Sequence, residues 1–165
     1  MGCDMKRVLC LAIMAAILAA VPQSWAVLEA GSTLPEITVT GSFPSTVQRG
    51  EKVTGAITIE IPKGWHLYAP GDHQYKKLTV TKGKGPVSRV KFTYPAGVTQ
   101  DVAGERVSLY EGQVNVNFEG KVSKKAATGH ATWRPEVTWQ SCSDSICLAP
   151  ETGALTIEFE IKGGK

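Results

Sequence analysis

The sequence predicts an all-β protein with an immunoglobulin-like antiparallel β-sandwich fold, and three observations support this prediction. Apolar residues alternate with polar or small ones in three segments, at residues 53–61, 114–118 and 155–161. This two-residue period is typical of strands with one buried and one solvated face. Gly and Pro interrupt the chain between strand-like segments, and no window has a sustained helical period. A small β-barrel is the competing architecture.

Shorter strand-like segments bring the total to the number that a sandwich needs. In chain order, we expect these shorter strands at residues 36–40, 78–81, 89–94, 128–133 and 137–140. Turns rich in Gly and Pro are expected at residues 62–64, 69–72, 83–86 and 95–97.

The N-terminus has the pattern of a secretory signal peptide. Positive residues precede an uninterrupted apolar run at residues 8–21, and residues 24–26 place small side chains where a signal peptidase prefers them. The apolar run is too short to span a bilayer comfortably. We therefore expect residues 1–26 to be removed by cleavage after Ala26, which leaves residues 27–165 as a single exported domain.

Composition excludes several functional classes for this domain. Removing residues 1–26 from 165 leaves 139 residues. Removing Lys6, Arg7 and Asp4 from 18 basic and 15 acidic residues leaves 16 and 14, a net charge of +2. Such a small charge, spread along the chain, does not form the basic patch that nucleic-acid binding requires. A second apolar run that could span a membrane is absent from the sequence.

The sequence offers no support for a metal, cofactor or hydrolase site. The histidines of the predicted domain, His66, His73 and His130, lack the spacing of zinc ligands. Copper favours Met beside His, and all three Met lie in the predicted signal. The sequence also lacks a G-x-S-x-G elbow and a phosphate-binding loop. We therefore expect neither a metal nor a cofactor.

The strongest feature is a pair of cysteines near the C-terminus. Cys3 and Cys10 leave with the signal, so Cys142 and Cys147 are the cysteines of the mature domain. Four residues separate them, which is an ordinary hairpin loop, and export makes a disulfide their default state. Facing residues in a non-hydrogen-bonded antiparallel pair have Cα atoms about 4.5 Å apart, which a disulfide allows.

Loop length alone leaves the role of this disulfide open. A bridge closing about six residues removes roughly 2 kcal/mol of unfolded-state freedom, whereas one closing ~60 residues removes roughly 4 kcal/mol. The short loop therefore disfavours a mainly stabilising bridge, and labile disulfides are often catalytic or regulatory. Against this, Lys, Arg and His are absent between the cysteines, and Asp144 opposes formation of a thiolate. The residues alone leave redox exchange and a passive hairpin clip as equal alternatives.

Four motifs extend this reading. Residues 137–152, VTWQSCSDSICLAPET, form the most specific one, and three shorter motifs precede it: Gly64-Trp65-His66-Leu67-Tyr68, Tyr94-Pro95 and Tyr110-Glu111-Gly112. In this order they resemble the N-terminal domain family of the thiol–disulfide interchange protein DsbD, the disulfide bond corrector domain. The resemblance covers residues 64–152.

The resemblance implies an immunoglobulin-like sandwich with a redox-active disulfide between adjacent strands. Cys142 and Cys147 would be the redox pair, with Cys147 attacking the disulfide of a partner protein. Family members receive electrons from a membrane or thioredoxin-like donor. They pass them to thioredoxin-fold proteins of the periplasm, including disulfide isomerases and cytochrome c maturation factors. The resemblance thus implies a periplasmic protein with thiol:disulfide oxidoreductase activity.

The resemblance also implies groups that shield the disulfide or contact partners. His66 and Tyr68 would stand where the family has an aromatic pair. A loop at residues 100–104, including Asp101 and Val102, would cover the disulfide and open when a partner docks.

The sequence departs from the family in several places. His66 stands where an aromatic residue is usual, and the predicted shielding loop has Val102 and Ala103 where familiar members carry an aromatic. Four residues separate the cysteines, where well-known members have five. The chain ends at Lys165 without a membrane channel or a thioredoxin-like domain, so we expect a separate protein to supply electrons.

Two hypotheses from different classes follow. The leading one is an exported relay that passes reducing equivalents through Cys142 and Cys147. The alternative is a non-enzymatic β-sandwich binding module in which the same disulfide staples a hairpin. Metal or haem delivery through His66 and the cysteines is the weakest interpretation.

Overall fold

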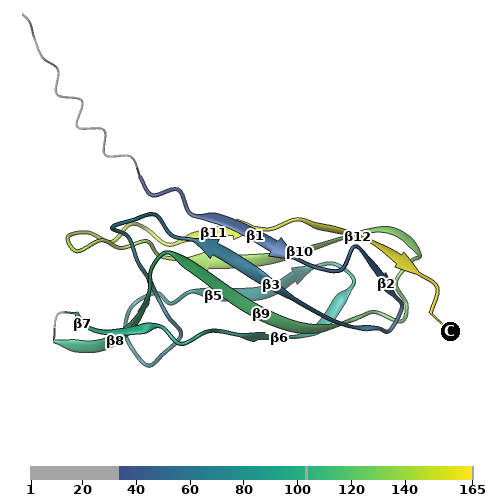
Figure 1. The fold of residues 1–165 in the computed structure, drawn as a ribbon, viewed down its shortest axis with the longest axis horizontal. Coiled ribbons are helices and arrows are strands. Elements are labelled where there is room, and N and C mark those ends of the chain that lie inside the picture. The colour runs from purple at the N-terminus through teal and green to yellow at the C-terminus, as the bar shows by residue number, and fades with distance from the viewer. Residues whose placement is uncertain (1–33, 103, 165) are drawn as a thin grey trace, which may run out of the picture. The chain divides into compact units, whose positions relative to one another are not determined.

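The computed structural model describes residues 34–102 and 104–164, and this part of the chain consists of strands and their connecting loops (Figure 1). The predicted signal peptide and its cleavage point after Ala26 lie outside the described residues. Where the chain is described, it has no helix that is long and apolar enough to cross a membrane. The prediction of an all-β fold is confirmed.

Four antiparallel strands form the first sheet of the sandwich. Their order is β1 (Thr38–Ser42), β3 (Lys52–Glu60), β9 (Gln113–Val122) and β6 (Val87–Thr93). The central strands β3 and β9 pair along their length without a register shift. Buried and exposed residues alternate along β9, as the two-residue period in the sequence predicted.

The second sheet is built around β10 (Gly129–Trp139). Its order is β11 (Glu151–Ala154), β10, β12 (Ile157–Lys162) and β2 (Thr46–Gln48), and β5 (Thr79–Lys84) also pairs with β10. The pairing of β12 with β2 is parallel, whereas the other pairings of this sheet are antiparallel, as predicted. The strands β12 and β2 lie far apart in the sequence, so no tight turn forces them to run in opposite directions.

Side chains from the two sheets form one hydrophobic core. Trp133 of β10 and Phe118 of β9 are among its largest buried members, and their rings pack edge to face with centroids 4.9 Å apart. The Trp133 ring N–H is satisfied by the carbonyl oxygen of Lys82 at 2.6 Å. Burial of such aromatic and aliphatic side chains supplies the main favourable free energy of folding.

β10 runs through Pro135 as one strand. Proline has no N–H to donate, and the pairing with β5 shifts register at this residue. Gly83 of β5 lies against the irregular stretch, where an added Cβ would stand 1.8 Å from the carbonyl oxygen of Arg134. Its φ of 50° is also in the left-handed region that favours glycine. This glycine therefore permits a close approach between two strands, whereas the sequence predicted a turn there.

The remaining predicted strands are present with shifted boundaries. The segments predicted at residues 36–40, 78–81 and 89–94 are β1, β5 and β6, and those at 128–133 and 137–140 are both parts of β10. The segment predicted at 155–161 begins later, as β12, because Leu155 lies between strands and donates its N–H to the carbonyl oxygen of Pro135 at 3.0 Å.

A third, small sheet lies at one end of the sandwich and was not predicted. Its order is β4 (Leu67–Tyr68), β8 (Glu105–Tyr110) and β7 (Val98–Val102). Most of β7 is exposed, so it lacks the alternation that reveals a strand in a sequence. The loop that carries the two cysteines follows β10 and lies at the same end (Figure 1).

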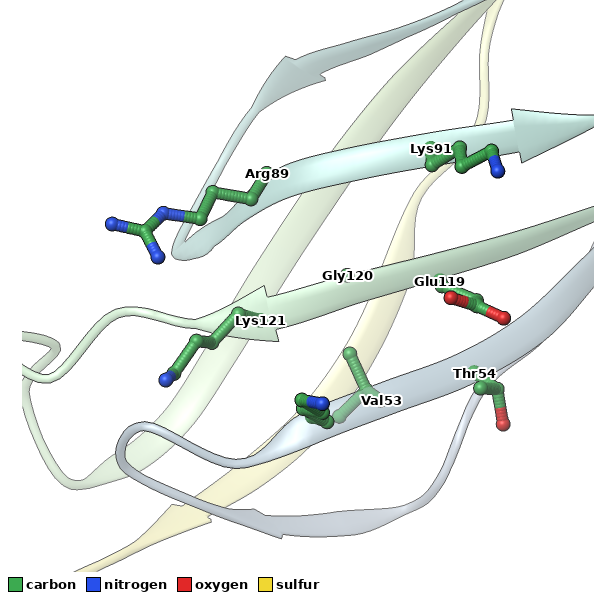
Figure 2. Close-up of a pocket in the computed structure, with 8 residues that line it drawn as sticks. Val53, Thr54, Arg89, Lys91, Glu119, Gly120 and Lys121 are labelled. Carbon is green, nitrogen blue, oxygen red and sulfur yellow. The ribbon is translucent and has the colours of Figure 1, made fainter.

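Positive charge gathers on the solvent face of the first sheet, around Lys121 near the C-terminal end of β9 (Figure 2). Lys52 of β3 and Lys121 of β9 are direct cross-strand neighbours, and Lys91 of β6 faces Glu119. Arg89 sits at a bulge of the edge strand β6 with a φ of 52°. Charges and a bulge on an edge strand discourage pairing with another molecule. The charges and the bulge of β6 therefore discourage another strand from pairing with this edge of the first sheet.

Candidate functional site

The two cysteines form a disulfide across a tight hairpin. Cys142 and Cys147 are an antiparallel pair with Cα atoms 4.1 Å apart. Two backbone hydrogen bonds flank the pair, from Ser143 N to Ile146 O (2.8 Å) and from Leu148 N to Ser141 O (2.9 Å). These bonds place the cysteines in a narrow, non-hydrogen-bonded pair. The predicted hairpin and disulfide are confirmed.

The two sulfur-bearing residues differ in exposure. Cys142 is 0% exposed, whereas Cys147 is an exposed residue. Ile146, beside Cys147, is 53% exposed. A partner thiolate or disulfide therefore meets the Cys147 side of the bond first, with an apolar side chain beside it.

Three side chains of this end share one face of a small ladder. His66 and Cys142 exchange backbone hydrogen bonds in both directions, at 2.8 and 3.0 Å, and Cys142 pairs with Cys147 on its other side. Directly paired residues of antiparallel strands project their side chains to the same face. The imidazole of His66 thus lies in the same row as the two sulfurs.

Cys142 is packed in a small apolar cluster that is separate from the main core. Tyr68, Val107 and Leu109 are its other buried members. Tyr75 and Val102 pack against them from the outside, half-buried. The third sheet thus provides the inner cysteine with its own apolar environment.

A pocket of about 400 Å³ lies beside this cluster and includes Cys147 in its wall. Asp101 and Val102 line the pocket from β7, and His66 and Tyr68 line it from the other side. The structure thus brings all the predicted site residues together. However, Asp101 and Val102 end a strand of a hairpin rather than forming an irregular loop.

The two predicted residues of this hairpin differ in their contacts. Val102 packs on the Cys142 cluster, whereas Asp101 is exposed and stands opposite Arg106 of β8. Because successive side chains of a strand point to opposite faces, it is Val102 and not Asp101 that packs toward the buried Cys142. Ala103 lies outside the described residues, and Gly104 follows with a φ of 82°.

An aromatic layer covers the outer side of the cluster. The rings of Tyr68 and Tyr75 stack in parallel, with centroids 4.2 Å apart and an interplanar angle of 2°. His66 meets the ring of Tyr68 edge-on at 5.5 Å. Tyr75 was not predicted as a site residue, because a tyrosine in a loop carries no local signal of what it stacks on. Trp65, which shares the predicted motif, packs against the main core instead.

Burial determines the protonation of this layer. It lowers the pKa of His66 below its ordinary value, although the carboxylates of Glu111 and Asp144 act in the opposite direction. It also raises the pKa of Tyr68, to which the neighbouring Tyr75 and Glu105 add. A neutral imidazole and a neutral phenol therefore lie beside the disulfide at neutral pH.

We expect mild acidification to destabilise the protein through His66. Its pKa is lower in the folded state than the value of about 6.5 in the unfolded state, so the unfolded state binds more protons below that value. The free energy of unfolding should therefore fall as the pH drops from the unfolded pKa to the folded one. Urea titrations at about pH 7.5, 6.5 and 5.5 measure this decrease.

The variant His66→Phe separates this contribution from the other titrating groups. It keeps an aromatic ring but cannot bind a proton, so its stability should fall less than that of the wild type over the same pH range. Equal pH dependence of the two proteins would contradict the assignment to His66.

The cysteine pair gives this end of the sandwich its reactive group. Among residues 34–102 and 104–164, three or more His, Cys, Asp or Glu side chains are nowhere gathered so that they could hold a metal ion. The arrangement can perform chemistry at sulfur: it holds one buried and one exposed cysteine in a bond that an incoming thiolate can reach.

Fold and site together define the class. This is an immunoglobulin-like β-sandwich domain with a hairpin disulfide at one end, in which one cysteine is buried and the other is exposed. Comparison with known families makes the assignment definite. The chain belongs to the family of the N-terminal domain of the thiol:disulfide interchange protein DsbD, whose model matches residues 36–158. The resemblance noted in the sequence is confirmed, and the family is one of thiol–disulfide interchange.

A solved structure with a TM-score above 0.5 shares the fold. The chain is similar to the N-terminal periplasmic domain of ScsB from Proteus mirabilis, with a TM-score of 0.51 and 18% identity over 74% of this chain and 45% of that chain. It is also similar to the N-terminal domain of Neisseria meningitidis DsbD in its reduced form, with a TM-score of 0.45 and 16% identity over 74% and 86%. The chain thus spans less than half of the ScsB chain. No curated protein matches it.

Proposed function

We propose that this protein is a periplasmic thiol–disulfide exchange protein. It relays reducing equivalents from a membrane or thioredoxin-like donor to exported thioredoxin-fold partners. Residues 1–26 act as the export signal, and residues 27–165 are the single redox domain. The observation that carries the proposal is the unequal exposure of the disulfide, with Cys142 buried and Cys147 at the surface.

The exposed cysteine takes the first step. In the reduced protein, the thiolate of Cys147 attacks a partner disulfide, forms a mixed disulfide and releases one partner thiolate. Cys142 then attacks the sulfur of Cys147, which restores the intramolecular disulfide and releases the second partner thiolate. Two electrons pass from the pair to the partner. The hairpin register supports this role because it holds the two sulfurs within bonding distance.

The surroundings of the disulfide support a transient protein partner. Ile146 offers an exposed apolar contact beside Cys147, and the pocket lined by Asp101 and Val102 opens next to it. His66 and Tyr68 cover the inner side. Cys147 itself is exposed, and the β7–β8 hairpin, whose Val102 packs on the Cys142 cluster, shields the inner cysteine until a partner docks.

A trapping experiment tests the relay. In the variant Cys142→Ser, Cys147 can attack a partner but the mixed disulfide cannot be resolved. We expect the exported variant to accumulate disulfide-linked complexes with thioredoxin-fold proteins, visible by non-reducing electrophoresis and identified by mass spectrometry. The variant Cys147→Ser is the matched control, because its remaining thiol is buried. If Cys142→Ser traps no thioredoxin-fold protein, or both variants trap the same proteins equally, the relay is wrong.

The reduction potential separates the relay from a binding module with a structural staple. A staple should have a potential below about −300 mV, and a disulfide in exchange should lie clearly above it. Equilibration of the purified domain with defined glutathione or dithiothreitol mixtures gives this value. The hairpin is already held by backbone hydrogen bonds and by the bond from Gln140 Nε2 to Leu148 O at 2.9 Å, so it has little need of a staple.

A further inference from the structure

His66 has a buried ring nitrogen that is not satisfied. Its side chain is 9% exposed, and within the described residues no hydrogen-bond partner reaches its Nε2 atom. A buried polar group without a partner costs stability, so its presence calls for an explanation. The cross-strand neighbour of His66 is Cys142, the inner member of the redox pair. A ring nitrogen without a hydrogen-bond partner thus stands beside a group that has to change its protonation.

Exchange requires Cys142 to lose a proton. In the mixed disulfide formed through Cys147, Cys142 is a thiol, and only a thiolate attacks a disulfide. Its sulfur is buried among the apolar side chains of Tyr68, Val107 and Leu109, where a bare thiolate is disfavoured. Because Cys142 is fully buried, solvent has poor access to the departing proton. A base on the protein itself would remove this obstacle.

We propose that the imidazole of His66 takes the proton from Cys142 in the resolving step, an inference that rests on the exchange function proposed above. Backbone hydrogen bonds in both directions fix the spacing of the two residues, and both side chains lie on one face. The edge-on contact with Tyr68 at 5.5 Å restricts the ring. His66 is therefore positioned by the same ladder that positions the disulfide.

The step balances in protons and electrons. The S–H bond of Cys142 breaks, and its proton moves to Nε2 of His66. The electron pair left on Cys142 attacks Sγ of Cys147, so that the intramolecular disulfide forms while the bond from Cys147 to the partner sulfur breaks. The partner sulfur leaves as a thiolate with the electron pair of the bond that has broken. The imidazolium then gives its proton to this thiolate or to solvent, and His66 is neutral again.

The electrostatic environment is consistent with a base at neutral pH. Burial lowers the pKa of His66, so its ring is neutral and free to accept a proton. The groups that face it are Glu111 beyond β8, Asp144 in the hairpin loop, and the phenol of Tyr68, while Asp101 lines the same pocket from β7. The carboxylates Glu111 and Asp144 favour the imidazolium once it forms.

A reagent that reports both steps separately tests the proposal. One equivalent of the chromogenic aromatic disulfide DTNB releases one coloured thiolate when Cys147 attacks and a second when Cys142 resolves. In stopped-flow measurements at neutral pH, the variant His66→Gln should show an unchanged first phase. Its second phase should be slower by about 100-fold, the usual contribution of a general base. A second phase that keeps its wild-type rate in this variant overturns the proposal.

The pH profile of the wild type provides a test that needs no variant. With His66 as base, the second-phase rate should stay level as the pH falls from neutral to the pKa of His66, and decrease only below it. Without a base, the rate should fall by about tenfold per pH unit from the outset, because only the pre-formed thiolate reacts. If the wild type shows this second behaviour, the proposal is wrong.

Chemical rescue distinguishes proton transfer from packing. Added imidazole should restore the second phase in His66→Ala, and it should not do so if the ring merely fills space. The relay and this proposal can fail independently. In Cys142→Ser only the first phase should appear, whatever the role of His66. A protein that traps no partner can still show a second phase that depends on His66.

Discussion

In the reduced protein, Cys147 is expected to react with iodoacetamide about 100-fold faster than Cys142, which corresponds to an opening free energy of about 2.7 kcal/mol for the buried thiol. The difference follows from exposure, because Cys142 is completely buried in its apolar cluster and Cys147 is at the surface. Alkylation requires both access and a thiolate, and burial removes both.

The measurement uses the two single-cysteine variants, so that each reaction reports one thiol. Cys142→Ser leaves Cys147 free, and Cys147→Ser leaves Cys142 free. Mass spectrometry follows the added group over time in native buffer and again in concentrated urea, where the two rates should become nearly equal. Equal rates in native buffer would show that the inner cysteine is not protected in the reduced protein, and would remove the main support for Cys147 as the attacking group.

The second large effect is on stability. The substitution Gly83→Ala is expected to lower the free energy of unfolding by about 3 kcal/mol or more, because two penalties combine. The residue has a φ of 50°, which disfavours any side chain, and the new Cβ would stand 1.8 Å from the carbonyl oxygen of Arg134. To accept it, β5 and β10 would have to separate beside Pro135.

Gly64→Ala is the matched control for this prediction. Gly64 has a φ of 82°, and an added Cβ there meets nothing within 4 Å. This substitution carries the backbone penalty alone, about 1–2 kcal/mol. Urea denaturation of both variants gives the two losses, and their difference measures the cost of the contact with Arg134. If Gly83→Ala lowers the free energy of unfolding no more than Gly64→Ala does, the close approach of β5 and β10 does not contribute to the loss of stability.

The parts of the fold that sequence predicted well are those where side-chain pattern and burial coincide. β3 and β9 alternate because one face of each packs on the second sheet. β7 could not be found in this way, because its strand conformation depends on hydrogen bonds to β8 and leaves no pattern in its own composition. The parallel partnership of β2 with β12 is equally invisible, because it joins segments that no local turn connects.

In the candidate site, too, local sequence predicted some residues, and only the tertiary fold revealed the others. Spacing predicted that Cys142 and Cys147 face each other across a hairpin. Family resemblance placed His66, Tyr68, Asp101 and Val102 near them. The packing partners of Cys142 on β8, Val107 and Leu109, were not predicted. Each lies in an ordinary strand pattern that reads as core, and only the tertiary fold shows that their core is the small one around the cysteine.

The continuity of β10 affects how much conformational freedom the cysteine loop loses when a partner protein docks. This strand is held on both edges, by β5 up to Thr138 and by β11 up to Trp139, and the chain reaches Cys142 three residues after Trp139. A rigid approach of this kind leaves little conformational freedom to be frozen when another protein docks, and such preorganisation preserves affinity. Contacts can then stay small and short-lived, which suits the relay proposed above, in which each partner is released after one exchange.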